Sequence, residues 1–216
     1  MKSVLALTLL ASLTPAVRIL AAGDTPCCGE ITPEGRRLAK VFDSMHVESL
    51  WLAHEHVNWE TGRPDKDADY EGPGKSTHCS AFAASVGKRL GAYMLRPPEH
   101  GQILLASAQA KWFSSPKGQA AGWQEVPSAR KAQRLANQGN LVVVVFDNPN
   151  AHKPGHIAIV RPSGKTLTEL RTEGPQVIQA GQHNYQSTST QNGFRMHAGA
   201  WPDGVRYYAH PVSQNP

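Results

Sequence analysis

The stretch NLVVVVFDNPNAHKPGHIAIVRP, residues 140–162, decides the fold of this chain. It holds two apolar, β-branched runs, VVVV and IAIV, separated by a segment rich in Asn, Pro and Gly. Short apolar runs bounded by turn-forming residues are typical of buried strands. We therefore predict two buried strands here, and His156 stands at the start of the second one.

The flanking sequence predicts helices on the N-terminal side and strands on the C-terminal side. Apolar residues recur at helical spacing in residues 32–59, 79–90, 104–113 and 129–137, with Ser76 or Thr77 available as the N-cap of the second segment. Further strands are expected in residues 165–170, 175–181 and 205–210, between Gly, Pro and Asn turn signals. This order favours an α+β domain with a central antiparallel sheet.

The N-terminus resembles a secretory signal. Lys2 precedes an apolar run over residues 4–13, and small residues follow up to Ala22. We expect residues 1–22 to be a signal peptide, with cleavage after Ala16 or after Ala22, and residues 23–216 to form a single catalytic domain. A run of ten apolar residues is too short to span a bilayer, so we expect no stable membrane insertion after signal removal. The expected location is periplasmic or extracellular.

Charge and cysteine content restrict the function further. The net charge of +5 comes from scattered basic residues rather than from a block with interleaved aromatic residues, so no nucleic-acid partner is predicted. Three cysteines are an odd number for an oxidising compartment. A bridge between the neighbours Cys27 and Cys28 would be strained, so we expect one to pair elsewhere or both to be incidental. Cys79 then remains as the thiol to explain.

Cys79 begins a predicted helix and could be either a nucleophile or inert packing. The free backbone N–H groups and the positive end of the helix dipole stabilise a thiolate at this position. However, cysteine is also among the residues most often buried in a core. A base within reach would favour catalysis, and His156 is the candidate because it begins a strand after Gly155. The other histidines are interpreted mostly as solvated.

A third polar group should orient the imidazole from the next strand. In residues 175–185, PQVIQAGQHNY, alternation places Val177 and Gln179 on one face. Gln179 is the first choice because a neutral amide can accept the far ring N–H and fix the tautomer. Asn184 could do the same or hold substrate, and either amide could instead be an ordinary polar residue on an exposed face.

Together, the motifs HCSAF, GHIAIV and VIQAG resemble the NlpC/P60 and CHAP superfamily of papain-like cysteine peptidases and amidases, over residues 70–184. The resemblance implies N-terminal helices packed on a central antiparallel sheet and hydrolysis of amide bonds in peptidoglycan peptides. It also implies catalysis by Cys79, His156 and Gln179, with an oxyanion or substrate contact from Tyr70 or Asn184. No metal or organic cofactor is implied, and the expected partner is peptidoglycan or a peptide substrate.

Three other interpretations stay open. The first is a non-catalytic wall-binding or inhibitory module. The second is an acyltransferase or toxin-like effector on the same fold, for which an immunity or inhibitor protein would be a partner. The third and most distant is a zinc hydrolase.

Overall fold

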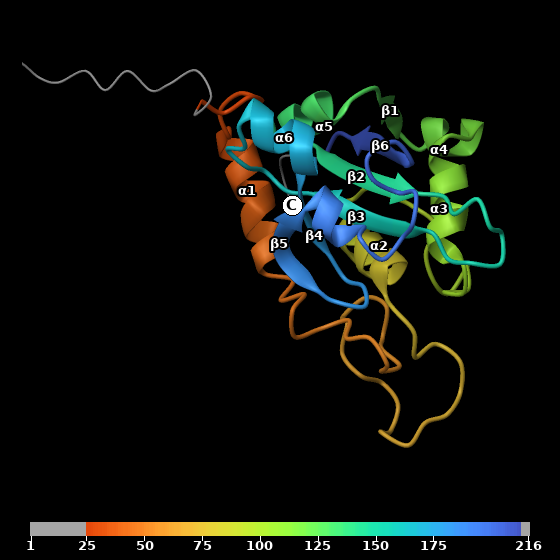
Figure 1. Cartoon of the computed structure of the whole chain (residues 1–216). Helices are drawn as coiled ribbons and strands as arrows, with labels where there is room; N and C mark the ends of the chain where they lie inside the picture. The colour runs from red at the N-terminus through yellow and green to blue at the C-terminus, as the bar shows by residue number, and fades with distance from the viewer. Residues whose placement is uncertain (1–24, 213–216) are drawn as a thin grey trace, which may run out of the picture.

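The computed structural model describes residues 25–212, and within that range it shows an α+β fold built on one six-stranded antiparallel sheet (Figure 1). The strand order is β1-β6-β2-β3-β4-β5, and every neighbouring pair is antiparallel. The strands are β1 (Gln124–Val126), β2 (Leu141–Phe146), β3 (His156–Val160), β4 (Gln176–Gln179), β5 (Tyr185–Ser189) and β6 (Val205–His210). The predicted fold class is confirmed at this level.

The central strands β2 and β3 are buried along their whole length because helices cover both faces of the sheet. Ile157 and Ile159 pack in one apolar cluster with α2 (Cys79–Arg89) and α3 (Leu105–Phe113). Ala158 and Val160 pack in a second cluster with α5 (Ala129–Asn137). The continuous VVVV and IAIV runs follow from this two-sided burial, since neither face of these strands meets water.

The prediction of one or two helices over residues 32–59 is correct only for the first part of this range. Helix α1 (Pro33–Asp43) begins at the N-cap Thr32 and ends at Ser44. Beyond it the chain runs through turns, and Trp51 adopts a positive φ of 53° while its Nε1–H donates to the Trp59 carbonyl at 2.9 Å. Trp51 and Val57 are buried from this irregular segment. Their spacing therefore reflected burial of single side chains rather than a helical period.

Two further local predictions are wrong. Residues 165–170 do not form a strand, because α6 (Leu167–Glu173) occupies most of them. Thr166 Oγ1 accepts the Glu169 N–H at 3.2 Å, and the Glu169 carboxylate accepts the Thr166 N–H at 2.7 Å. These two bonds form a capping box, and the sequence TLTE has the spacing that is typical of one. The N-cap of α2 is His78, without a side-chain capping bond, rather than Ser76 or Thr77.

Several short elements escaped the sequence patterns. These are α4 (Pro116–Ala120), α7 (Thr190–Gly193) and the edge strands β1 and β5. Figure 1 shows that the loops between α1 and α2 extend beyond the sheet as a projecting lobe. Among the described residues, no helix has the length and apolarity needed to cross a membrane. The predicted signal peptide lies outside the described residues.

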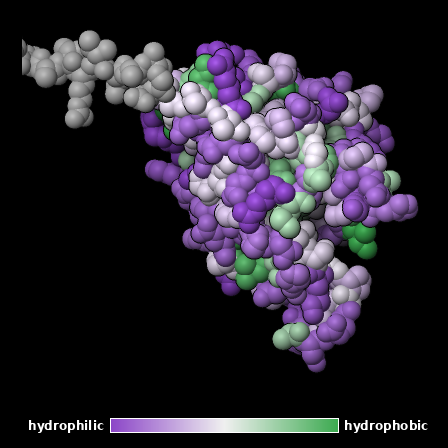
Figure 2. All heavy atoms as spheres, in the orientation of Figure 1, coloured by the Kyte–Doolittle hydropathy of each residue, from purple (hydrophilic) through white to green (hydrophobic). Residues whose placement is uncertain are grey.

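The cysteine pairing also differs from the prediction. Cys27 and Cys28 form a disulfide with each other, and Cys79 is the free cysteine of the described chain. Cys28 is buried, and the Cys27 N–H donates to the Lys165 carbonyl at 2.9 Å. The outer surface is mostly hydrophilic in the face drawn in Figure 2. The exposed large apolar side chains of residues 25–212 are Tyr93, Ile103, Leu104 and Met196.

Candidate active site

The three residues of the predicted triad lie at one end of the sheet. Cys79 is the first residue of α2, His156 is the first residue of β3, and Gln179 is the last residue of β4. Because β3 and β4 are antiparallel, the start of one strand adjoins the end of the other. Helix α2 packs mainly on β3, so its N-terminus is brought to the same region.

His156 and Gln179 form a buried hydrogen-bonded pair. The Nε2 atom of His156 lies 2.9 Å from Gln179 Oε1, and both residues are 3% exposed. The Gln179 amide is oriented by a second bond, since its Nε2 donates to the His183 carbonyl at 3.3 Å. With the amide fixed in this way, the imidazole must carry its proton on Nε2 and donate it to Oε1. The Nδ1 lone pair is then the basic position of the ring.

A stack of rings surrounds the imidazole. His197 is stacked on His156 with centroids 4.7 Å apart and planes inclined by 16°, and Phe194 contacts it edge-on at 4.7 Å. Burial, reinforced by the nearby His197, lowers the pKa of His156 to about 3, although the bond to Gln179 opposes the shift. Burial also lowers the pKa of His197. Both rings are therefore neutral at physiological pH, but a pKa of about 3 makes His156 a weak base in this environment.

The Cys79 thiol is held behind this pair, in the apolar cluster between α2 and the sheet. The residue is 6% exposed, and burial raises the pKa of the thiol to about 11. The backbone amides of Ile157, Ser80 and Cys79 hydrogen-bond to the sulfur and favour the thiolate, but burial outweighs them. The helix N-terminus thus acts as predicted, yet the resting group is a protonated thiol.

The thiol and the imidazole are neighbours without being bonded to each other. The amide that contacts the sulfur belongs to Ile157, the residue directly after His156. The His156 side chain, however, projects to the face that carries Phe194, whereas α2 covers the opposite face. Within residues 25–212, no hydrogen bond joins the sulfur to the His156 ring, which instead bonds to Gln179.

A cleft of about 200 Å³ opens on the imidazole side of the strand end. It is bounded by the entry to α2, the β4–β5 turn and the segment from α7 onward. The lining residues are Thr77, Pro154, His156, Gln179, Gly181, Gln182, His183, Tyr185, Asn192, Gly193, Arg195, Met196 and His197. Cys79 is not part of this lining in the described chain, so the cleft borders the imidazole and its orienting amide but not the thiol.

Asn184 and Tyr70, the predicted oxyanion or substrate contacts, are engaged elsewhere in the structure. Asn184 Nδ2 donates to the carbonyls of Val47, Leu50 and Trp51 at 2.7, 2.8 and 3.2 Å, and its Oδ1 accepts the Gly181 N–H at 2.9 Å. Its amide is saturated by backbone partners, so it fastens the β4–β5 turn to the segment after α1.

Tyr70 stays within its own loop. Its hydroxyl donates to the Pro73 carbonyl at 3.3 Å, and its ring packs against His56. Neither Tyr70 nor Asn184 is among the described residues that line the cleft.

Two histidines that the sequence interpretation left in solvent are packed instead. His197 stacks on His156, and His78 is 1% exposed with Nε2 lying 2.9 Å from the Glu55 carbonyl. Burial lowers the pKa of His78. Neither histidine lies in a run of apolar residues with helical or strand spacing. The sequence therefore gave no indication that His197 is packed. The position of His78 directly before a buried cysteine was the one available hint.

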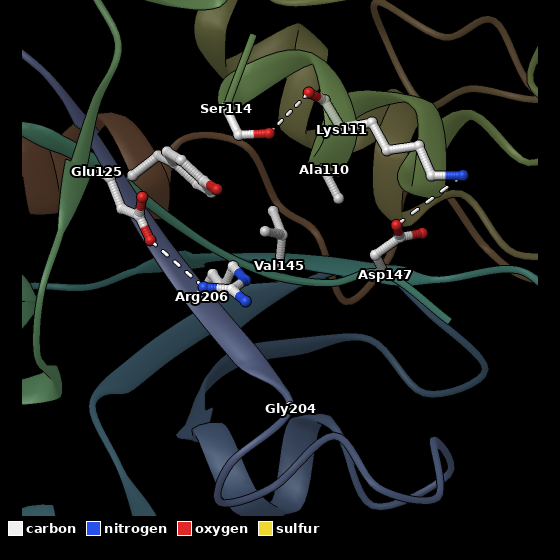
Figure 3. A pocket seen from close by; sticks show the side chains of 9 residues that line it. Ala110, Lys111, Ser114, Glu125, Val145, Asp147, Gly204 and Arg206 are labelled. Carbon is white, nitrogen blue, oxygen red and sulfur yellow. Dashed lines mark hydrogen bonds and ion pairs between the residues drawn. The ribbon is translucent and has the colours of Figure 1, made fainter. Parts of the chain in front are cut away.

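A second and larger hollow lies between α3 and the sheet (Figure 3). It measures about 430 Å³, and its walls include Lys111, Glu125, Asp147 and Arg206 around Ala110 and Val145. Its charges pair with each other, because Lys111 lies 3.9 Å from Asp147 and Arg206 lies 3.5 Å from Glu125. The described lining contains neither histidine nor cysteine.

Comparison with models of known protein families finds no match for the chain, and comparison with curated proteins also finds none.

Proposed function

We propose that the chain is a cysteine hydrolase that cleaves amide bonds in peptidoglycan peptides, in an NlpC/P60-like arrangement of Cys79, His156 and Gln179. The observation that carries the proposal is the hydrogen bond of 2.9 Å between His156 and Gln179, with the amide of the following residue on the Cys79 sulfur. Nucleophilic acyl transfer requires an oriented, neutral imidazole and a thiol at one site, and the structure brings both residues to the same end of the sheet, with the ring and the sulfur on opposite faces of β3.

The reaction follows from these groups. The thiol must lose its proton as the sulfur attacks the amide carbonyl, since a thiol with a pKa of about 11 is not ionised at rest. Because the ring and the sulfur lie on opposite faces of β3, the proposal requires a water molecule at the strand end to carry this proton to His156 Nδ1. The C–N bond then breaks, and the imidazolium gives its proton to the departing amine. A water molecule, deprotonated by the same Nδ1, hydrolyses the thioester and restores the thiol. The backbone N–H of Cys79 is the proposed donor for the oxyanion.

Gln179 orients the His156 ring during both proton transfers but neither gives nor takes a proton itself. Its oxygen accepts the Nε2 proton in the neutral ring and keeps that bond in the imidazolium, where the interaction is stronger because the donor is charged. The donor on the other end of the amide, directed at the His183 carbonyl, prevents the amide from turning over. The ring therefore returns to the same tautomer after each cycle.

The proposal is tested by digesting purified sacculi with wild type, Cys79→Ala and His156→Gln and identifying the released fragments by mass. We expect fragments from wild type and none from either variant. His152→Ala is the matched control, because His152 is an exposed histidine of the β2–β3 loop and should leave the digestion unchanged. Equal fragments from wild type and Cys79→Ala would refute the thiol mechanism.

A non-catalytic wall-binding module is the second candidate, and the burial of Cys79 favours it. A thiol with 6% exposure and a pKa raised to about 11 should react slowly with iodoacetamide at neutral pH. Co-sedimentation with sacculi separates the two functions. A module would sediment with sacculi and release nothing, whereas a hydrolase would release fragments whatever its affinity for the polymer.

A further inference from the structure

The cleft beside His156 carries one permanent charge, and that charge is positive. Arg195 follows α7 and lines the cleft together with the residues of the His156–Gln179 pair. No aspartate or glutamate is among the described lining residues. The stacked rings of His156 and His197 have lowered pKa values and add no charge at neutral pH. The guanidinium of an arginine is not deprotonated in proteins.

The Arg195 guanidinium is positioned but not neutralised. Its Nη1 donates to Asn192 Oδ1 at 2.8 Å, and Asn192 Nδ2 donates to Thr188 Oγ1 at 2.8 Å. The second bond fixes the Asn192 amide so that its oxygen faces the arginine. In residues 25–212, Arg195 forms no ion pair with a carboxylate, in contrast to Arg206 in the second hollow, which lies 3.5 Å from Glu125. The remaining N–H groups of a planar guanidinium match the two oxygens of a carboxylate.

The size of the cleft places such an anion close to the His156–Gln179 pair, which lines the same cleft. A volume of about 200 Å³ is below the range of sites that enclose drug-sized ligands, so it accommodates a short segment of a substrate. A ligand group at Arg195 and a carbonyl group near His156 must therefore belong to the same residue or to adjacent residues of a peptide.

We propose that Arg195 binds a free carboxylate of the substrate, next to the amide bond that is cleaved. The substrate class is then a peptide with a carboxylate on the residue at the scissile bond or on its neighbour, and neutral or amidated peptides are poor substrates. This inference rests on the proposed function for the statement that the bound peptide is cleaved next to its carboxylate. The binding of the carboxylate itself does not depend on turnover.

The test measures binding rather than catalysis. Acetyl-alanyl-alanine and its C-terminal carboxamide are titrated by calorimetry into wild type, Arg195→Met and Arg195→Lys. We expect wild type to bind the free acid at least about tenfold more tightly than the amide, and Arg195→Met to lose this difference. Arg195→Lys should keep part of it, because a lysine retains the charge but not the planar fork. Added salt should reduce the preference for the acid.

Arg206→Met is the control, since Arg206 is an exposed arginine in the other hollow and should leave both affinities unchanged. Equal affinity for acid and amide in wild type, an undiminished preference in Arg195→Met, or no measurable binding of either peptide at millimolar concentration would each overturn the inference. If sacculi are not cleaved but the acid is preferred through Arg195, the hydrolase proposal fails and the carboxylate site stands.

Discussion

Replacing Asn184 with alanine should destabilise the protein strongly, although Asn184 lies at the edge of a turn. Its side chain makes one accepted bond, from Gly181, and shares two amide protons among three backbone carbonyls. Each net hydrogen bond contributes about 1 kcal/mol, and the bonds lost in the variant leave partly buried backbone groups unsatisfied. We expect the free energy of unfolding to fall by about 3 kcal/mol, and the melting temperature to fall by roughly 6–12 °C for a chain of this size.

Urea unfolding monitored by tryptophan fluorescence measures this loss. Asn184→Asp is the matched comparison, because aspartate keeps the acceptor for the Gly181 N–H but places a carboxylate against three carbonyl oxygens, so it should be at least as unstable as the alanine variant. A catalytic Asn184 would give the opposite pattern, with activity lost and stability retained. A loss of less than about 0.5 kcal/mol in Asn184→Ala would refute the assignment of this residue as a structural fastening.

Three further outcomes are expected. Gly193→Ala should lower the digestion of sacculi roughly a hundredfold, because the added Cβ would lie 2.6 Å from Gln179 Oε1 and displace the amide from His156. Gly181→Ala should stay active, because its Cβ would lie 3.4 Å from the nearest atom, Gln179 Nε2. The free energy of unfolding should fall as pH drops from about 6.5 towards 3, because His156 is protonated in the unfolded state but stays neutral in the folded state, where its pKa is about 3. Urea midpoints of wild type and His156→Gln, measured over this pH range, test this. The same dependence of the midpoint on pH in both proteins would contradict it. Thr166→Ala should cost about 1 kcal/mol by removing the α6 capping box, and a wild-type urea midpoint would argue against that role.

Local chemistry made part of the fold predictable. The β2 and β3 runs, helices α3 and α5, and the last strand β6 were expected from apolar runs and helical spacing, and the structure has them. The irregular segment after α1 was not predictable in this way. Its buried Trp51 and Val57 reach the core from turns, so their spacing imitates a helix. The segment at α6 was predicted as a strand between turn signals, although the spacing of Thr166 and Glu169 is that of a capping box.

The candidate site was likewise predictable only in part. Alternation in residues 175–181 places Val177 and Gln179 on one face, and Gln179 is the first choice as partner of His156 because an amide can accept the ring N–H. In the structure the two side chains are hydrogen-bonded to each other. It could not show that the amide of Asn184 is consumed by three distant carbonyls, or that His197 covers the imidazole. The Asn184 bonds join positions more than 130 residues apart. His197 reaches His156 from a segment with no periodic pattern.

By itself, the sequence determined which elements exist around the buried strands and which residues begin them, because hydrophobic period and turn chemistry are local properties. Only the tertiary structure decided the state of the thiol. The helix N-terminus at Cys79 stabilises a thiolate, as the sequence implied, but the packing of α2 against β3 removes water from the sulfur, and the loss of hydration raises the pKa of the thiol to about 11. Solvation depends on every element that covers a group, so no stretch of sequence around Cys79 could have fixed it.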